Sequence, residues 1–291
     1  MKTLFIINPV AGRKRSAKVW KDIRPYINFP YEYEFTQGCG DAIQIAKHAK
    51  KLGYEVIVTV GGDGTISEVV NGIAGSDIRL GIIPAGTGND FGKTLKIPEN
   101  PRYALEIIKE GKNLTFTDLG KFQDGYFINI AGAGFDAEVA NMTNSNLKFL
   151  NGTLAYVASL VWNLARYSPC NAVITVDGKR YFRKPWLVLA ANARYFGGGM
   201  MINPDGIIND GLLDVCIIND MSRAEILRFL PSVFTGSHKK HRCFEVIRGK
   251  NVEIEFAKPV RVQVDGDAKG FTPVRFSIVN RALSVITPVK D

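Results

Sequence analysis

Over the first 110 residues, the order of apolar and polar positions switches between strand-like and helix-like patterns. The segment EVIVTV at residues 55–60 is the most strand-like, because its apolar residues form a short, nearly continuous run. The predicted strands cover residues 3–8, 31–36, 55–60 and 80–83, and the predicted helices cover residues 16–27, 41–52 and 66–73. Strands that alternate with helices in this way predict an α/β domain with a doubly wound, mostly parallel sheet.

The pattern changes near residue 112, where short strand-like runs become frequent. The predicted strands cover residues 114–119, 126–131, 172–176, 186–191, 213–218, 251–256, 260–264, 274–278 and 283–286, and the predicted helices cover residues 153–166 and 222–234. Asp177-Gly178 is a typical hairpin turn. We therefore expect a first domain at residues 1–120 and an antiparallel, β-rich second domain at residues 121–280. The pattern leaves open whether residues 280–291 return to the first domain.

Length and composition agree with two globular domains. The chain has 291 residues, 46% of them hydrophobic, and a domain has roughly 100–200 residues. Lys and Arg number 37 against 28 for Asp and Glu, and the net charge of +9 favours a nucleotide, a nucleic acid or an anionic membrane as partner. No apolar run approaches the roughly 20 residues that span a bilayer. The four cysteines form no CxxC pair, which argues against zinc and disulfides and favours a cytoplasmic protein.

The strongest motif is Gly61-Gly62-Asp63-Gly64-Thr65, which lies between the most strand-like segment and a predicted helix. Glycines allow a tight turn and a close approach of the backbone to a ligand, and the helix that follows offers free N–H groups to an anion. Asp63 would repel a phosphate on its own, but it suits a Mg²⁺ ion that bridges carboxylate and phosphate. A purely structural turn is the alternative.

A second loop of the same kind follows the next strand. Residues 84–91 read PAGTGNDF and offer glycines, the hydroxyl of Thr87 and the carboxylate of Asp90. Loops at the carboxyl ends of adjacent parallel strands open on the same edge of the sheet, where ligands bind. Two such loops, each with one Asp, predict a nucleotide–metal site.

A third loop, Asn8-Pro9-Val10-Ala11-Gly12, ends the first predicted strand and therefore belongs to the same edge. Residues 13–15, Arg-Lys-Arg, follow directly. These cations either attract phosphate or form a solvated basic turn, and the sequence does not decide between the two.

Together these motifs resemble the soluble diacylglycerol kinase and sphingosine kinase superfamily of lipid kinases, particularly its bacterial members with a diacylglycerol kinase catalytic domain. GGDGT alone is weak, since NAD kinases and phosphofructokinases carry similar stretches, whereas P-x-G-T-x-N-D-F is much more specific. The matching segments also include residues 8–12, Thr36 with residues 40–42, residues 209–213 and residues 264–267. The resemblance implies an ATP-binding first domain of the NAD kinase/phosphofructokinase type and a β-sandwich second domain that supplies the lipid cleft.

The resemblance also implies roles for individual residues. Asp63 and Asp90 would organise the catalytic Mg²⁺. A second, structural Mg²⁺ would take the Asp210 carboxylate and the carbonyls of Ile207 and Leu212, although residues 209–211 read alone only as a turn. ATP would contact Asn8, Pro9, Val10, Ala11, Gly12, Thr36, Gly61, Gly62, Asp63, Gly64, Thr65 and Thr87.

The stretch Asp265-Gly266-Asp267 departs from the family motif, Asp-Gly-Glu, because Asp267 is one methylene shorter than Glu. Read alone, the stretch is a hairpin turn after residues 260–264, while alternation along a strand would place both carboxylates on one side. With the resemblance, one of the two is the general base that takes the hydroxyl proton, and the other orients it or holds a metal. The sequence leaves open which Asp is the base.

Two segments suit a lipid or a membrane. Residues 154–165 are almost entirely apolar and form either a core- or cleft-facing helix or an interfacial helix. Residues 237–242, SHKKHR, form either a solvated loop or a basic patch that attracts anionic lipid, and we expect His238 and His241 at the surface.

The sequence thus predicts ATP-dependent phosphoryl transfer to the hydroxyl of diacylglycerol or a related membrane lipid. The protein is expected in the cytoplasm, peripherally bound to the inner face of an anionic membrane. No nucleic-acid-binding signature is present, and a homodimer stays open. The alternatives are an NAD kinase-like enzyme with a soluble substrate and a non-catalytic regulator that binds lipid or nucleotide.

Overall fold

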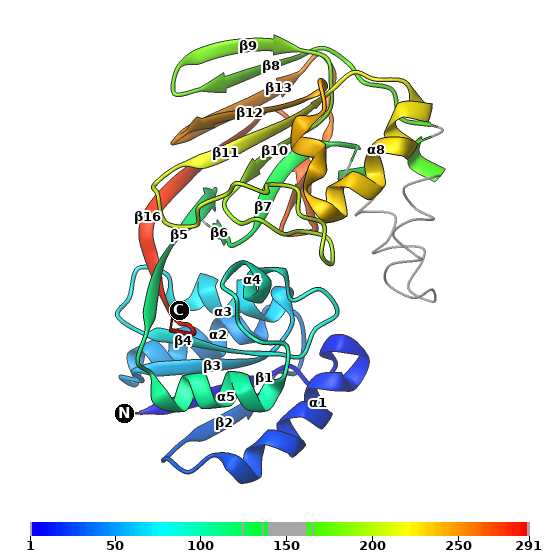
Figure 1. Ribbon diagram of the computed structural model, residues 1–291. Coiled ribbons are helices and arrows are strands. Elements are labelled where there is room, and N and C mark those ends of the chain that lie inside the picture. The colour runs from blue at the N-terminus through cyan, green and yellow to red at the C-terminus, as the bar shows by residue number, and fades with distance from the viewer. Residues whose placement is uncertain (1, 124, 136, 139–161, 165, 290–291) are drawn as a thin grey trace. The chain divides into compact units, whose positions relative to one another are not determined.

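The computed structural model describes residues 2–123, 125–135, 137–138, 162–164 and 166–289. The chain divides into unit 1, Met1–Leu119 with Val279–Asp291, and unit 2, Gly120–Ile278. It passes between them in two strands, β5 (Leu114–Phe122) and β16 (Val274–Ile286), which pair with each other (Figure 1).

Unit 1 is built on a parallel sheet in the order β2-β1-β3-β4. Its strands are β1 (Thr3–Ile7), β2 (Glu32–Phe35), β3 (Val56–Gly61) and β4 (Arg79–Pro84). In the register, Leu4 pairs with Ile57 on one side and with Glu32 on the other, and Ser284 of β16 continues the sheet beside Arg79. Every residue of β1 and β3 is buried, as their apolar runs require, while β2 is an exposed edge.

Helices cover both faces of this sheet. They are α1 (Ala11–Ile23), which the 3₁₀ turn η1 (Arg24–Tyr26) follows, α2 (Asp41–Lys51), α3 (Asp63–Ile73), α4 (Asp90–Thr94) and α5 (Pro101–Glu110). α1 packs with α5, and α2 packs with α3 on the opposite face (Figure 1). A Cβ on Gly72 would lie 2.5 Å from that of Ala46, so the approach of α2 to α3 depends on this glycine. The predicted doubly wound domain is confirmed.

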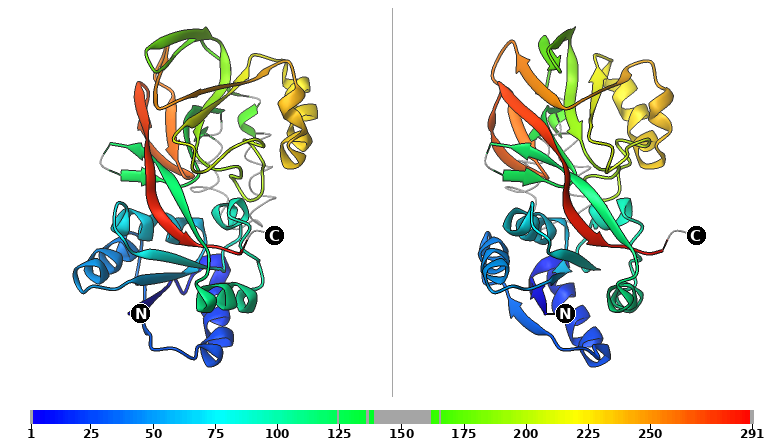
Figure 2. Two further views of the ribbon diagram at one scale, coloured as in Figure 1. Left: turned by 60° about the vertical axis from the view of Figure 1, so that its left-hand side comes forward. Right: turned by 90° about the vertical axis from the view of Figure 1, so that its left-hand side faces the viewer.

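The described residues of unit 2 form two antiparallel sheets and include the helix α8 (Arg223–Thr235) (Figure 2). The first sheet has the order β12-β11-β10-β7-β14-β15, and in the second β16, β13, β8 and β9 follow one another. The strands are β6 (Gly125–Phe127), β7 (Ile130–Gly134), β8 (Ala172–Val176), β9 (Lys179–Arg183), β10 (Pro185–Ala191), β11 (Leu213–Asn219), β12 (Phe244–Gly249), β13 (Asn251–Phe256), β14 (Arg261–Val264) and β15 (Asp267–Phe271). The predicted antiparallel second domain is confirmed.

The central strand β10 of the first sheet of unit 2 is buried on both faces. Val188 and Ala190 of β10 pack into a core shared with the second sheet, while Leu187 and Leu189 pack into a core under α8 (Arg223–Thr235). Alternate residues of one strand thus serve two cores, as the pleat of a strand requires. None of the helices in the described part of the chain has the length and hydropathy of a membrane-spanning segment.

Some predicted elements differ from the structure. The predicted strand 126–131 is two strands, β6 and β7, with a break at Ile128 and Asn129. The predicted strands 274–278 and 283–286 are one continuous strand, β16, in which Arg281 has a left-handed φ of 51°. The short helix α4, helix α5 and strands β9, β12 and β15 were not predicted. Most of the predicted helix 153–166 lies outside the described residues.

Candidate functional site

Three loops at the carboxyl ends of β1, β3 and β4 pack against one another, as the sequence predicted. We call residues 8–12, 61–65 and 84–91 the glycine loops. A Cβ on Gly86 would lie 2.4 Å from the Cα of Gly62, and one on Gly12 would lie 2.2 Å from the carbonyl oxygen of Ala85. The N–H of Ala85 also donates to the carbonyl of Gly61 at 2.9 Å. Glycine is therefore required by main-chain contact between the loops, before any ligand is considered.

Asn8 connects the first glycine loop to the second. Its Nδ2 donates to the Thr65 hydroxyl at 3.1 Å, and its Oδ1 accepts the N–H of Val10 at 3.2 Å. Gly12, Arg13 and Lys14 all have left-handed φ values, of 56°, 58° and 72°, so the regular part of α1 begins only after Lys14. Residues 13–15 are exposed at this edge.

Asp63 connects the second glycine loop to the third. It is the first residue of α3, and its Oδ1 accepts the N–H of Phe91, in the first turn of α4, at 2.9 Å. Asp90, which precedes Phe91, is only 4% exposed. Asn89 has a φ of 53°, and its side chain accepts the N–H of Gly86 at 2.9 Å and donates to the Gly86 carbonyl at 3.3 Å. The structure therefore bonds Asp63 to the residue that follows Asp90, and it gives Asn89 a role that sequence reasoning did not assign.

The remaining residues predicted to contact ATP differ in exposure. Val10 is 68% exposed and Thr87 is also exposed, whereas Thr65 and Thr36 are buried. Thr36 follows β2, and its N–H donates to the Ile7 carbonyl at 2.9 Å. Thr87 and the first N–H groups of α3 are thus groups of this edge that can meet a phosphate directly.

In unit 2, Asp265 lies in the turn that joins β14 to β15. Asp265 and Gly266 have left-handed φ values of 48° and 90°, which confirms the hairpin turn. The Asp265 carboxylate accepts three N–H groups, from Ile128 at 2.9 Å, Asn129 at 2.9 Å and Ile130 at 3.2 Å. These bonds replace the sheet partners of the segment between β6 and β7 and explain why the predicted strand 126–131 is broken.

Asp267 has a different environment. It opens β15, its side chain is 70% exposed, and its nearest cation is Lys269 Nζ at 3.7 Å. The expectation that strand alternation places both carboxylates on one side is wrong, because Asp265 belongs to the turn and only Asp267 to the strand. One carboxylate holds the backbone, and the other faces solvent.

The predicted structural metal site contains a cation of the protein itself. The Asp210 Oδ1 accepts the N–H of Leu212 at 3.1 Å, and its Oδ2 bonds the Arg248 guanidinium. Arg248 also donates to Asp214 Oδ1 at 2.7 Å, and this bond contributes most to raising the pKa of Arg248. Ile207 is 51% exposed. Sequence reasoning missed Arg248, because no local pattern links residues 38 positions apart.

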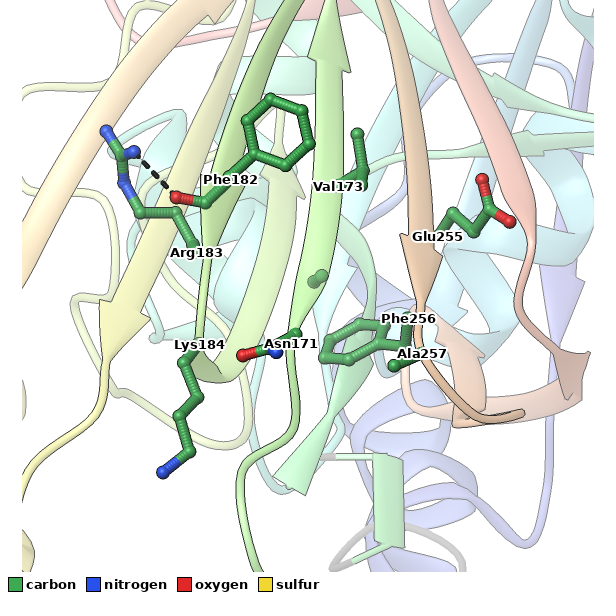
Figure 3. Close-up of a pocket in the computed structure, with 9 residues that line it drawn as sticks. Asn171, Val173, Phe182, Arg183, Lys184, Glu255, Phe256 and Ala257 are labelled. Carbon is green, nitrogen blue, oxygen red and sulfur yellow. Dashed lines mark hydrogen bonds between the residues drawn. The ribbon is translucent and has the colours of Figure 1, made fainter.

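Unit 2 has several hollows, and two of them differ sharply in size and lining; neither of these two is lined by a predicted site residue. An open depression of about 630 Å³ on β8, β9 and β13 is flanked by Phe182 and Glu255 (Figure 3). A smaller cavity of about 60 Å³ lies in the core under α8 and is lined by twelve apolar side chains, among them Trp186, Met200 and Phe229. Within the described residues, no group of three His, Cys, Asp or Glu side chains could hold a metal ion.

The basic run 237–242 is only partly a solvated loop. His238 is 1% exposed, which corrects the expectation that it lies at the surface, and burial lowers the pKa of its imidazole. Its Nε2 lies 3.1 Å from the Ile202 carbonyl. Lys239 and Lys240 are exposed.

Two family profiles match this chain. The "Diacylglycerol kinase catalytic domain" matches residues 2–121, and the "YegS C-terminal NAD kinase beta sandwich-like domain" matches residues 129–287. A diacylglycerol kinase from Bacillus subtilis (strain 168) is 32% identical over 290 residues, 98% of this chain and 95% of the relative. One from Mycobacterium tuberculosis (strain ATCC 25618 / H37Rv) is 34% identical over 256 residues, 85% of this chain and 82% of the relative.

Solved structures agree with these matches. The crystal structure of a diacylglycerol kinase from Bacillus anthracis str. Sterne superposes with a TM-score of 0.81 at 27% identity, over 99% of this chain and 97% of the other. The glycine loops, the two-unit architecture and the near full-length matches together place the chain in the diacylglycerol kinase family.

Proposed function

We propose that this protein is an ATP-dependent lipid kinase that phosphorylates the hydroxyl of diacylglycerol or a related membrane lipid. The observation that carries the proposal is the joining of the three glycine loops at one sheet edge, with Asp63 bonded to the N–H beside Asp90. Family membership narrows the acceptor to a lipid. Phosphoryl transfer requires mainly positioning and charge neutralisation, which such an edge can supply.

ATP is held by the glycine loops. Main-chain N–H groups at the start of α3 bind phosphate oxygens, and the exposed Thr87 hydroxyl adds a donor. Asn8 and Thr65 act indirectly, because their side chains bond each other and fix the shape of the loops. Residues 9–12 and Thr36 border the same edge.

Asp63 and Asp90 would hold the catalytic Mg²⁺. Carboxylate oxygens are the ligands that this ion prefers. Oδ1 of Asp63 accepts the N–H of Phe91, and no donor within the described residues bonds Oδ2 of Asp63, which leaves Oδ2 for a cation. When bound, the ion would neutralise charge on the phosphates.

Asp267 is the general base of the proposal, and Asp265 is a positioning residue. Three N–H donors hold the Asp265 carboxylate, so both of its oxygens already bond the backbone. The exposed Asp267 can receive the hydroxyl proton through Oδ1 or Oδ2, and Lys269 Nζ lies 3.7 Å from its Oδ2. Its arm is one methylene shorter than the Glu of the family motif.

The structural Mg²⁺ at Asp210, Ile207 and Leu212 does not fit the arrangement in the structure. Both Asp210 oxygens have protein donors, and one donor is the guanidinium of Arg248. A cation there would have to displace Arg248, and the proposal assigns no role to this metal.

The lipid acceptor comes from a membrane in this proposal, and the protein meets the cytoplasmic face peripherally. The net charge of +9 supports a substrate on an anionic surface.

One assay tests the proposal. Purified protein receives labelled ATP, Mg²⁺ and micellar diacylglycerol, and the product is extracted into organic solvent. Label in a phosphorylated lipid supports a lipid kinase. Label that stays in a water-soluble product, with no phospholipid formed for any of several glycerolipids and sphingoid bases, contradicts it.

A further inference from the structure

Helix α8 carries apolar residues on two faces. The inner face, with Ile226, Phe229 and Val233, is buried against the first sheet of unit 2. The outer face carries a second apolar stripe with helical spacings of three and four, and all of its members are exposed: Ala224, Leu227, Pro231 and Phe234. Leu227 is 49% exposed and Phe234 is 46% exposed.

This outer face differs from that of an ordinary surface helix. A surface helix usually keeps one apolar stripe and fills the opposite face with polar residues. In α2, the exposed positions include Gln44, Lys47, His48 and Lys51. The second stripe of α8 therefore has no packing reason within the described part of unit 2.

Two cations of α8 border the stripe, because Arg223 and Arg228 lie three or four positions from its members. Three more cations, Lys239, Lys240 and Arg242, follow the helix in the chain. Two of these five are neutralised, since Lys239 bonds Asp205 at 2.7 Å and Arg242 bonds Glu225 at 2.7 Å. Among the described residues, Arg228 and Lys240 have no carboxylate partner, so the border of the stripe keeps a positive charge.

We infer that the outer face of α8 docks on an anionic lipid bilayer, with Leu227 and Phe234 inserted among the headgroups and Arg228 and Lys240 near lipid phosphates. An exposed apolar stripe with basic flanks is the pattern of an interfacial helix. With 13 residues, α8 is too short to span a bilayer, and it therefore lies along the surface. The inference rests on the proposed lipid substrate, which the bilayer would present to unit 2.

The charge of the border favours a bilayer over the alternatives. A second copy of the chain would bring the same positive border against this one, at a cost in repulsion. A bilayer with anionic headgroups complements both the cations and the apolar stripe.

The test is binding to phosphatidylcholine vesicles with and without phosphatidylglycerol, measured by flotation. We expect the wild-type protein to prefer the anionic vesicles. The double variant Leu227→Ser/Phe234→Ser should lose affinity for the anionic vesicles by a factor of about ten or more, because two inserted apolar groups are lost. Lys240→Gln should weaken binding by a smaller factor and reduce its salt dependence.

The matched control is Phe182→Ser. Phe182 is 71% exposed, on β9 rather than α8, so this variant loses an equally large exposed apolar group elsewhere in unit 2. It should bind vesicles as the wild type does. Thermal unfolding, and turnover of a short-chain diacylglycerol dispersed as monomers, should be unchanged in all variants, because none of these residues belongs to the glycine loops or the β14–β15 turn.

Three results would overturn the inference. The double variant binds vesicles like the wild type, or Phe182→Ser loses as much vesicle affinity as the double variant, or the wild-type protein is a dimer in solution and the double variant is a monomer. Failure of the kinase proposal has a different signature. In that case no lipid is phosphorylated in any form, while vesicle binding still depends on Leu227 and Phe234.

Discussion

The glycine loops of unit 1 and the β14–β15 turn of unit 2 are fixed in different ways. The loops are fixed by main-chain contact, such as that between Gly62 and Gly86, and by side chains that bond from loop to loop. The turn is fixed by one carboxylate, Asp265, which holds three N–H groups of a distant segment. Under the proposed function, structural and chemical roles share the same residues in the loops, whereas in the turn they are divided between Asp265 and Asp267. The two roles should therefore separate by mutation in unit 2 and not in unit 1.

The largest effect is expected from Asp267→Asn. Loss of a positioned base should lower kcat by about 10²–10⁴-fold. The unfolding temperature should stay the same, because the side chain is 70% exposed. Turnover is measured with Mg²⁺-ATP and lipid saturating. Asp267→Glu, which restores the family residue, is the control and should keep substantial activity. Near wild-type turnover in Asp267→Asn would show that Asp267 is not the general base.

Asp265→Ala should mainly affect stability. The three N–H donors belong to Ile128, Asn129 and Ile130, which are all buried, and the loss of their acceptor should cost about 3–5 kcal/mol of unfolding free energy. Urea unfolding measures this cost. Asp265→Asn keeps one acceptor oxygen, so its free energy of unfolding should fall by less than that of Asp265→Ala. If both variants are as stable as the wild type but inactive, Asp265 is the base and the division of roles in the turn is wrong.

Gly86→Ala tests the main-chain contact in unit 1. The new Cβ would meet the Cα of Gly62 at 2.4 Å, and backbone cannot yield as a side chain does, so we expect a loss of about 1–3 kcal/mol together with weaker ATP binding. Gly64→Ala is the matched control, since a Cβ there has nothing within 4 Å. Equal stability of the two variants, by urea unfolding, would show that the glycines serve the ligand alone.

The smallest expected effect is on the pH dependence of the unfolding temperature, and it comes from Glu225 at the start of α8, outside both regions. The backbone N–H of Ser222, the Ser222 hydroxyl and Arg242 lower the pKa of Glu225 from 4.5 to about 2. A lowered pKa stabilises the fold above pH 4.5, and this contribution disappears as the pH falls toward 2. Glu225→Gln should flatten this part of a plot of unfolding temperature against pH. A plot that keeps its slope would assign the dependence to other carboxylates.

Local features of the fold could be predicted from the sequence. The apolar runs of β1, β3 and β4 and the glycines behind them predicted both the sheet and the edge at which the loops meet. The turn at Asp177 was recognised because Asp-Gly supplies two residues with left-handed φ, found here at 46° and 83°.

Features that depend on distant residues were not predictable. The break at Ile128 arises from a carboxylate 137 positions away, and the polar residues between 278 and 283 hid the continuity of β16. His238 lies within a basic run, yet it is buried because Ile202 and Ser232 supply carbonyls to its ring. Strand β15 is exposed throughout, so its sequence carries no alternation to recognise.

The contact between Gly62 and Gly86 has a consequence for how pseudoenzymes of this fold are recognised. The two glycines are needed for the loops to pack, whether or not a nucleotide binds. Proteins of this fold that have lost catalysis would still retain both glycines, because replacement of either glycine disturbs folding. Glycine signatures are thus a poor guide to activity among divergent copies. The exposed Thr87 and Asp267, which folding does not protect, would be the first to drift once selection for turnover ends.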